Sequence, residues 1–166
     1  MYDVIKNLVA SQTKKDAKKE GLSFAIIQAN PEMVTNIKRA LSVEDRFFVK
    51  DVLGQITAFH IDQIEALAFM PNSEELIVVT CYEFLEHDGG TNNGREFAEE
   101  IWKVRPQAQV FIYEPHFKVT PNQISGGKIA GIIPSNPDDS TDHSALLNFI
   151  RFKMLEHAVQ KLAPSK

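Results

Sequence analysis

The sequence predicts an α/β domain in which helices cover both faces of a parallel β-sheet. Short apolar runs rich in β-branched residues alternate five times with segments whose apolar residues recur at helical spacing. In the clearest run, residues 76–79, four consecutive apolar residues lie between polar positions, and three of them are β-branched. This pattern is typical of a strand buried on both faces. We therefore expect a doubly wound sheet of five parallel strands.

The composition favours one globular domain without nucleic-acid or membrane partners. The chain has 166 residues, of which 43% are hydrophobic and 24% charged, enough for a full core. Because its formal net charge is -4, a polyanionic partner is not expected. The single cysteine excludes an internal disulfide and a cysteine-rich zinc site. No signal peptide or membrane span is recognisable, so we expect a cytoplasmic protein.

Residues 1–22 are predicted to form an arm separate from the domain. A short apolar stripe precedes a charged run, and Gly21 is a suitable end for an amphipathic helix. We expect this arm to pack on the domain or on a partner protein. A basic helix lying on a membrane surface is the alternative, although its apolar face is small.

Two strands and two helices are predicted in the next part of the chain. Residues 23–29 form the first strand, and Asn30 caps a helix that has Pro31 in its first turn. Residues 46–52 alternate around three apolar positions and give the second strand. Residues 56–68 have apolar side chains at helical spacing, which predicts a helix that ends at the following proline.

The rest of the chain alternates in the same way, with one connection cut short. Segment 114–127 contains two prolines and a Gly-Gly pair, so it has room for about one helical turn at most. The other predicted elements are strands at residues 75–80, 108–113 and 128–133, a helix from Gly94 to about 105, and a long helix at 144–162. The domain thus spans residues 23–163.

Several of these segments resemble the receiver domains of two-component response regulators. The resemblance lies in the apolar strand and Asn-Pro of residues 26–31, in residues 75–79, 94–106 and 109–113, and in the Gly-Ile-Ile of residues 131–133. It covers roughly residues 23–160. It implies a CheY-like fold with strand order 2-1-3-4-5, a shortened fourth helix and a long C-terminal helix, in a signalling protein.

The residues that carry phosphoryl transfer in receiver domains are replaced in this chain. By resemblance, the metal-binding acidic pair falls on Gln28 and Ala29, the phosphoacceptor aspartate on Thr80, the switch Ser/Thr on Glu114, and the lysine near Ser135. Transfer to a carboxylate needs a nucleophile, a divalent metal and a cation that holds the phosphoryl oxygens. Because all three are missing, the resemblance implies a pseudo-receiver: a non-enzymatic module, without a cofactor, that binds a partner protein.

An alternative is a ligand-binding site or an enzyme in the crevice at the carboxyl ends of the strands. Cys81 follows the third strand, and Glu114 and His116 follow the fourth, so the three side chains could form a cluster there. However, a lone cysteine at a strand end is usually a packed small hydrophobe, and an acidic loop disfavours its thiolate.

The loop after the third strand could hold an ion, although it matches no known motif. The candidate ligands for a hard divalent cation are Glu83, Glu86, His87, Asp88 and Glu114. Residues 87–94 have the glycines of an anion-binding loop but lack the lysine and the glycine spacing of phosphate-binding motifs. We therefore expect a solvated turn and no metal.

The last helix carries more apolar residues than one core-facing stripe needs. Leu146, Leu147, Ile150 and Met154 can pack inward. A second set lies on a partly different face: Phe149, Phe152, Leu155, Val159 and Leu162. One interpretation is a wide core-facing stripe, and the other is a surface for dimerisation or docking. We expect a homodimer, or binding to a partner signalling protein, through this second set.

Overall fold

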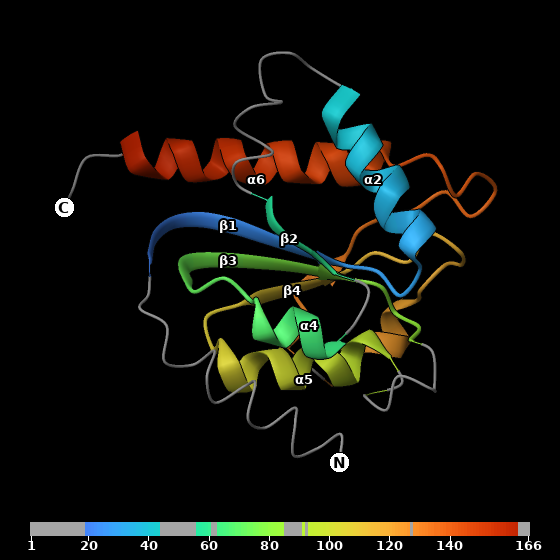
Figure 1. Ribbon diagram of the computed structural model, residues 1–166, viewed down its shortest axis with the longest axis horizontal. Coiled ribbons are helices and arrows are strands. Elements are labelled where there is room, and N and C mark those ends of the chain that lie inside the picture. Colours follow the sequence, from blue (N-terminus) through green and yellow to red (C-terminus); the bar gives the residue numbers. More distant parts are fainter. Residues whose placement is uncertain are drawn as a thin grey trace.

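The protein folds as a parallel β-sheet covered by helices on both faces (Figure 1). The computed structural model describes residues 19–43, 56–60, 63–84, 91, 93–126 and 128–162. The strands are β1 (Lys19–Ile27), β2 (Ile56–His60), β3 (Ser73–Thr80), β4 (Gln109–Ile112) and β5 (Gly131–Ile132). The described helices are α2 (Pro31–Val43), α4 (Gln63–Ala68), α5 (Gly94–Val104), α6 (Ser144–Leu162) and η2 (Pro121–Ile124), a 3-10 helix of one turn. The predicted α/β class with a parallel sheet is confirmed.

The central strand of the sheet is β3. The strands lie side by side in the order β2-β1-β3-β4-β5, and each neighbouring pair is parallel. Within β3, Ile77 pairs with Phe24 of β1 on one side and with Gln109 of β4 on the other. The last five residues of β3, 76–80, are all buried, as predicted for a strand covered on both faces.

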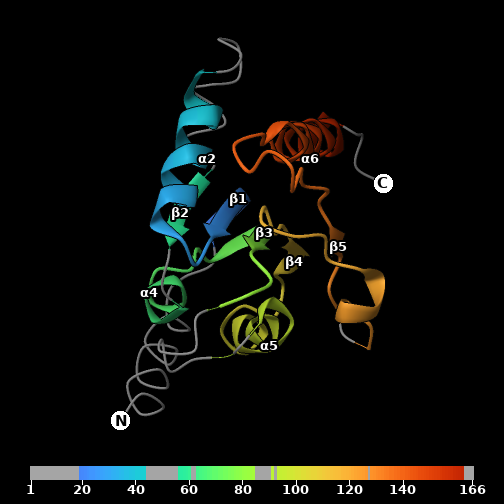
Figure 2. The ribbon, with the colours of Figure 1, turned by 90° about the vertical axis from the view of Figure 1, so that its right-hand side faces the viewer.

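Two hydrophobic cores lie on opposite faces of the sheet. Leu76 and Val78 of β3 point into the core covered by α4 and α5. Ile77 and Val79 point into the core covered by α2 and α6. Figure 2 shows these two helix pairs on opposite sides of the strands. Because side chains alternate along a strand, neighbouring residues of β3 join the two cores directly.

The region around β2 corrects the sequence prediction. The sequence predicts a helix over residues 56–68, but Ile56–His60 is strand β2 and only Gln63–Ala68 is helical. The helical spacing was misleading because the isoleucine, threonine and phenylalanine of this stretch also favour strands. Pairing with β1, where Ile26 lies opposite Phe59, decides between the two structures. The strand predicted at residues 46–52 lies outside the described residues.

The start of β1 also differs from the prediction. Gly21 does not end a helix but lies inside β1, which begins at Lys19. Its φ of +100° is in the left-handed region that favours glycine, and the register with β3 shifts between Lys19 and Leu22. The charged end of the predicted arm is thus part of the sheet. Residues 1–18 lie outside the described residues.

Most other elements follow the sequence closely, although β5 (Gly131–Ile132) is shorter than the strand predicted at residues 128–133. The Glu32 N–H donates to Oδ1 of Asn30 at 2.9 Å, which is the predicted N-cap of α2. In the described part of the connection after β4, η2 is the one helical segment, as its prolines and glycines predict, and α6 has the predicted bounds. No helix among the described residues combines the length and apolarity that crossing a bilayer requires.

Candidate functional site

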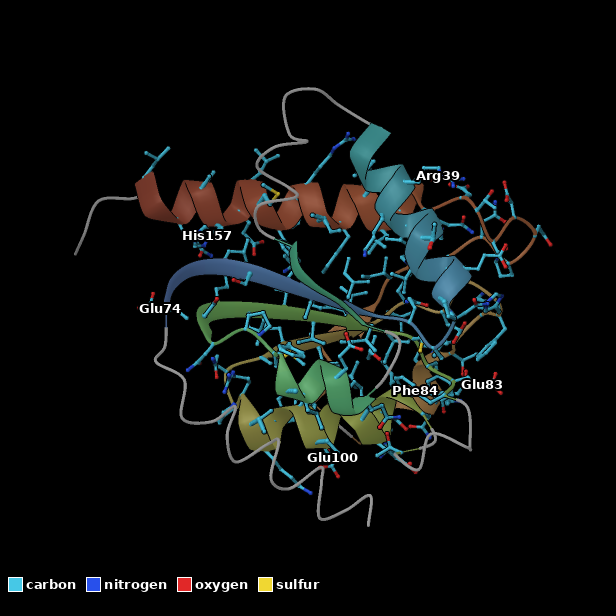
Figure 3. The ribbon with its side chains drawn as sticks, viewed as in Figure 1. Arg39, Glu74, Glu83, Phe84, Glu100 and His157 are labelled. Atoms are coloured by element: carbon cyan, nitrogen blue, oxygen red, sulfur yellow. The ribbon has the colours of Figure 1, made fainter. Side chains whose placement is uncertain are left out.

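Polar residues from three strands meet at the carboxyl-terminal edge of the sheet. Gln28 follows β1, Thr80 ends β3 and Glu114 follows β4, and all three are buried. Glu83 marks this edge at the right of Figure 3. A pocket of about 440 Å³ opens here, lined by Gln28, Ala29, Asn30, Pro31, Cys81, Glu83, Glu114 and His116.

The carboxylate of Glu114 binds three backbone N–H groups. Its Oε1 accepts hydrogen bonds from the N–H groups of Tyr82 at 3.2 Å and Glu83 at 3.1 Å. Its Oε2 accepts from the N–H of His116 at 3.2 Å. The Ser135 hydroxyl donates to the main-chain carbonyl of Glu114 at 2.7 Å. Glu114 therefore ties together the loops that follow β3, β4 and β5, and the N–H groups compensate its buried charge.

Gln28 and Thr80 are also hydrogen-bonded within the fold. The side-chain amide of Gln28 donates to the carbonyl oxygen of Tyr113 at 3.2 Å. The Thr80 hydroxyl is fully buried and donates to the carbonyl oxygen of Cys81 at 3.1 Å. Both side chains thus stabilise the strand ends, and neither supplies a carboxylate.

The residues at this edge do not fit the divalent metal of receiver domains. Gln28 and Ala29 offer at most one amide oxygen, and both carboxylate oxygens of Glu114 accept backbone N–H groups. Within the described part of the chain, no group of three or more His, Cys, Asp and Glu side chains is placed to hold a metal ion. Of the other ligands proposed from sequence, Glu83 lines the pocket, whereas Glu86, His87 and Asp88 lie outside the described residues.

Cys81 is not activated as a nucleophile. Its side chain is buried, and its Sγ donates to the carbonyl oxygen of Glu83 at 3.4 Å. Burial raises the pKa of the Cys81 thiol strongly, and the nearby charge of Glu114 raises it further. Cys81, Glu114 and His116 do line one pocket, as the sequence suggested, but the thiol stays protonated at neutral pH.

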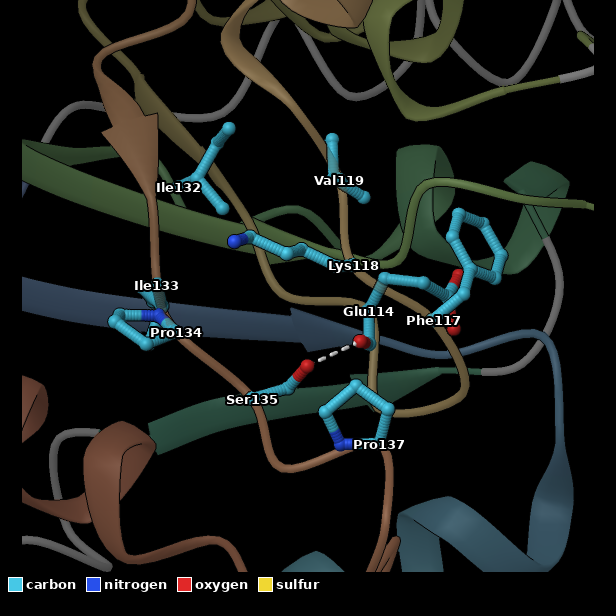
Figure 4. A pocket seen from close by; sticks show the side chains of 9 residues that line it. All are labelled: Glu114, Phe117, Lys118, Val119, Ile132, Ile133, Pro134, Ser135 and Pro137. Atoms are coloured by element: carbon cyan, nitrogen blue, oxygen red, sulfur yellow. Dashed lines mark hydrogen bonds between the residues drawn. The ribbon is translucent and has the colours of Figure 1, made fainter.

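A second pocket lies between the segments that follow β4 and β5 (Figure 4). It has a volume of about 350 Å³ and is lined by Glu114, Phe117, Lys118, Val119, Ile132, Ile133, Pro134, Ser135 and Pro137. Its walls are mostly apolar, and the side chain of Lys118 extends across it toward Ile132. Glu114 lines both pockets, so its position affects the shape of each.

The apolar residues of α6 fall on two sides of the helix. Phe149 packs on Phe111 of β4, with ring centroids 4.6 Å apart, and belongs to the core-facing side. The other four predicted contact residues are exposed: Phe152, Leu155, Val159 and Leu162. Leu146, Leu147 and Ile150 are buried as expected. The predicted second set is therefore a separate face, except for Phe149.

The far half of α6 is held on the sheet by a polar contact. Nδ1 of His157 lies 2.6 Å from Oε2 of Glu75, near the start of β3. His157 lies toward the left of Figure 3, at the opposite end from Glu83. This contact fixes which face of α6 points away from the sheet.

Two features of the site were not found from the sequence. The hydroxyl of Tyr113 lies 2.6 Å from Nδ1 of His143, in a buried pair beneath the start of α6. The amide-binding role of Glu114 was also missed, because sequence analysis treats this residue as a replaced position, as a partner of Cys81 and as a candidate metal ligand. Both depend on contacts between residues about 30 positions apart, and no local pattern reports such contacts.

Solved structures similar to this chain include receiver domains. One is the signal receiver domain of an HD domain-containing protein from Pseudomonas fluorescens Pf-5, with 16% sequence identity and a TM-score of 0.53, covering 85% of this chain and 97% of that chain. Another is the isolated REC domain of RcsB from Salmonella enterica serovar Typhimurium in the presence of phosphomimetic BeF3-, with 16% identity and a TM-score of 0.49, covering 78% of this chain and 90% of that chain. No protein-family model and no curated protein matches the sequence. The first of these likenesses shows that the chain has a receiver fold of the CheY-like kind.

Proposed function

We propose that this chain is a pseudo-receiver, a signalling module that works without phosphorylation and acts through protein–protein contacts. The observation that carries the proposal is the buried carboxylate of Glu114, which binds the backbone N–H groups of Tyr82, Glu83 and His116. These N–H groups lie at the edge of the sheet where the receiver fold would place its phosphoryl group. An anion is thus already present there, and it belongs to the chain.

The replaced residues support the same function. We infer that Gln28 and Ala29 stand for the acidic pair of the receiver fold, Thr80 for its phosphoacceptor, and Ser135 for its lysine. The Thr80 hydroxyl is buried and hydrogen-bonded, and it offers no carboxylate to accept a phosphoryl group. We therefore propose a cytoplasmic module, without enzymatic activity or cofactor, whose body ends near residue 163.

A permanent internal anion has a consequence for the loops around the site. In a two-state domain, a ligand shifts the equilibrium only by its differential affinity for the two states. The Glu114 contacts need no bound ligand, so they favour one arrangement of the loops after β3 and β4. Because Glu114 also lines the pocket between β4 and β5, that docking surface would be permanently formed.

The partner surfaces of the proposed module are the pocket between the segments that follow β4 and β5, the exposed face of α6 and the N-terminal arm of residues 1–22. The pocket offers apolar walls and the cationic Lys118, which fits an apolar side chain next to an acidic one. The partner is a second copy or another signalling protein, and neither a nucleic acid nor a membrane.

Titration with beryllofluoride and Mg²⁺ tests this function. Amide chemical shifts of residues 80–84 should show no saturable, Mg²⁺-dependent change, because no carboxylate accepts the beryllium and no acidic pair binds the metal. Mg²⁺ alone and fluoride alone are the controls. A saturable shift that needs both beryllofluoride and Mg²⁺ would contradict phosphorylation independence.

Small-ligand binding is a second candidate, favoured by the open pocket of about 440 Å³ at the strand ends. In its catalytic form this function needs a reactive Cys81. We expect Cys81 to alkylate slowly at pH 7 to 9, since burial and Glu114 both disfavour its thiolate. Fast alkylation in the native protein, with an apparent pKa below about 8.5, would favour the enzyme instead.

A further inference from the structure

We propose that two copies of this chain associate through α6 as a short parallel coiled coil. The contact surface is the exposed stripe Phe152, Leu155, Val159 and Leu162, called the α6 seam below. The proposal rests on the proposed function, because it names the partner of the module. The proposal adds that the partner is a second copy of the chain, that the two helices are parallel, and that the seam residues form the contact.

The seam is an unusual concentration of exposed apolar surface. Five large hydrophobic side chains are strongly exposed among the described residues, and four of them form the seam. The exposed fractions are 60% for Phe152, 53% for Leu155, 66% for Val159 and 84% for Leu162. Single exposed apolar residues are ordinary, but a contiguous stripe of them marks an interaction surface.

The seam lies on the side of α6 that points away from the sheet. Ile150 is fully buried in the core under α6, and Val159 follows it by nine residues. Nine steps of roughly 100° place the two side chains on opposite sides of the helix. The contact of His157 with Glu75 holds this orientation along the far half of α6. The seam therefore cannot be covered by the chain's own sheet.

The spacing of the seam is that of a coiled coil. Its residues are separated by three, four and three positions, which corresponds to the a and d positions of two heptads. A core-facing stripe of a globular helix is wider, because it also uses neighbouring positions. A narrow a/d stripe fits another helix that carries the same repeat, and a second α6 is such a helix.

The charges beside the seam favour a second copy in parallel orientation. With Phe152 at position a, Arg151 occupies position g and Glu156 the following position e. In a parallel pair, g of one helix faces the next e of the other, so Arg151 of each copy meets Glu156 of its partner. In an antiparallel pair centred on the seam, e positions instead lie beside e positions, so the Glu156 carboxylates of the two copies would repel each other. Within one chain Glu156 lies 3.5 Å from Lys153, a partly buried i,i+3 pair that a partner's arginine can join.

The size of the seam predicts a reversible dimer. Four side chains on each helix bury less area than the roughly 1,200–2,000 Å² of a stable interface. We therefore expect a dissociation constant on the order of 100 µM, so that the dimer forms as concentration rises.

Sedimentation velocity on the full chain, from about 10 µM to about 1 mM, tests the dimer. The mean mass should rise from monomer toward dimer. Leu155→Lys should abolish the rise, because it places like charges in the centre of the seam. Gln160→Lys adds the same charge at an exposed position outside the seam and should leave the rise unchanged. A wild-type chain that stays monomeric, or a Leu155→Lys variant that still dimerises, overturns the proposal.

Orientation is tested by disulfide trapping. In a parallel pair, identical d positions face each other, so Leu162→Cys should oxidise to a covalent dimer with itself. The native Cys81 is buried and should contribute little background. A mixture of Phe152→Cys and Leu162→Cys chains that yields mainly the mixed disulfide would overturn the parallel arrangement.

The two proposals fail in different ways. A monomeric chain that shows no response to beryllofluoride overturns the α6 dimer and leaves the pseudo-receiver in place. A chain that dimerises through the seam but responds to beryllofluoride with Mg²⁺ overturns phosphorylation independence and leaves the dimer in place.

Discussion

At the scale of residues, one buried side chain organises the loops at the strand ends. A buried carboxylate is costly unless hydrogen bonds replace its hydration, and Glu114 obtains three from backbone N–H groups. The Ser135 hydroxyl holds the carbonyl of the same residue. These bonds lie within the fold and need no ligand. They join the loops that follow three strands, so Glu114 and Ser135 hold this edge of the sheet together.

Replacing Glu114 by glutamine should loosen these loops. Glutamine has one carbonyl oxygen and an amide that cannot accept a hydrogen bond, so at least one N–H group of residues 82, 83 or 116 loses its partner. We expect a loss of about 1–3 kcal/mol in the free energy of unfolding, measured by urea denaturation. Hydrogen exchange at the Tyr82 and Glu83 amides should also become faster.

Glu83→Gln is the matched control for this variant. Glu83 is an exposed carboxylate in the same loop, so its replacement should change the free energy of unfolding by less than about 0.5 kcal/mol. Equal effects of the two substitutions would contradict the role given to Glu114.

His143 should make the stability of the protein depend on pH. It is buried, Nδ1 contacts the Tyr113 hydroxyl, and Nε2 has no hydrogen-bond partner among the described residues. Burial lowers the pKa of His143, although the charges of Asp142 and Asp139 oppose this shift. A protonated ring would need an acceptor for each nitrogen. The folded state therefore binds the proton less well than the unfolded chain, whose histidine has a pKa of about 6.5.

The sign of the effect follows from proton linkage. The stabilising contribution of neutral His143 is present above about pH 6.5 and is lost as the pH falls below that value. The free energy of unfolding of the wild-type protein should decrease from pH 7 to pH 5. In the His143→Asn variant this free energy should decrease less, because asparagine does not titrate. The other four histidines are common to both proteins, so the difference reports His143. If the free energy of unfolding depended on pH equally in the two proteins, His143 would not be responsible for the pH dependence.

At the scale of elements, the junction between β3 and α5 depends on one glycine. Gly94 begins α5, and its N–H donates to the carbonyl oxygen of Tyr82 at 2.6 Å. A Cβ atom at this position would collide with the carbonyl oxygen of Cys81 and lie 2.9 Å from Cδ1 of Ile112. The absence of a side chain lets α5 begin directly against the strand ends.

Gly94→Ala should therefore destabilise the protein although alanine is the better helix former. We expect a loss of about 1–3 kcal/mol from the forced shift of α5, measured by thermal or urea unfolding. Glu99→Ala, at an exposed position of the same helix, should change stability by less than about 0.5 kcal/mol. A stabilised Gly94→Ala variant would mean that the junction relaxes without cost.

Elements with strong local signals were predicted well, and those decided by pairing were not. The N-cap of α2, the bounds of α6 and the single turn η2 follow from Asn30, from the apolar repeat and from the prolines and glycines. Ile56–His60 is a strand because β1 offers it an edge, and this information lies elsewhere in the chain. Lys19 and Glu20 belong to β1 for the same reason, although their charges favoured a solvated arm.

At the scale of the whole molecule, the order of apolar runs predicted the parallel α/β class. It did not predict the hydrogen bonds that hold the loops at the strand ends together. The runs alternate with helices, and this alternation leaves few architectures open. The sequence also placed Gln28, Thr80 and Glu114 at strand ends. It could not show that Glu114 reaches the N–H groups of Tyr82 and Glu83, because that contact depends on the spacing between β3 and β4.

The two cores should unfold together, because β3 belongs to both. Leu147 lies in the core under α6, and Trp102, the single tryptophan, packs against the core under α5. Leu147→Ala should lower the free energy of unfolding by about 2–5 kcal/mol through the cavity it leaves. Trp102 fluorescence and far-ultraviolet circular dichroism should report this loss at one common urea midpoint.

If the cores were independent, the fluorescence midpoint would stay at its wild-type value while the circular dichroism transition split in two. Alternating side chains of Ile77, Val78 and Val79 exclude such independence, since a strand cannot leave one core while it remains packed in the other.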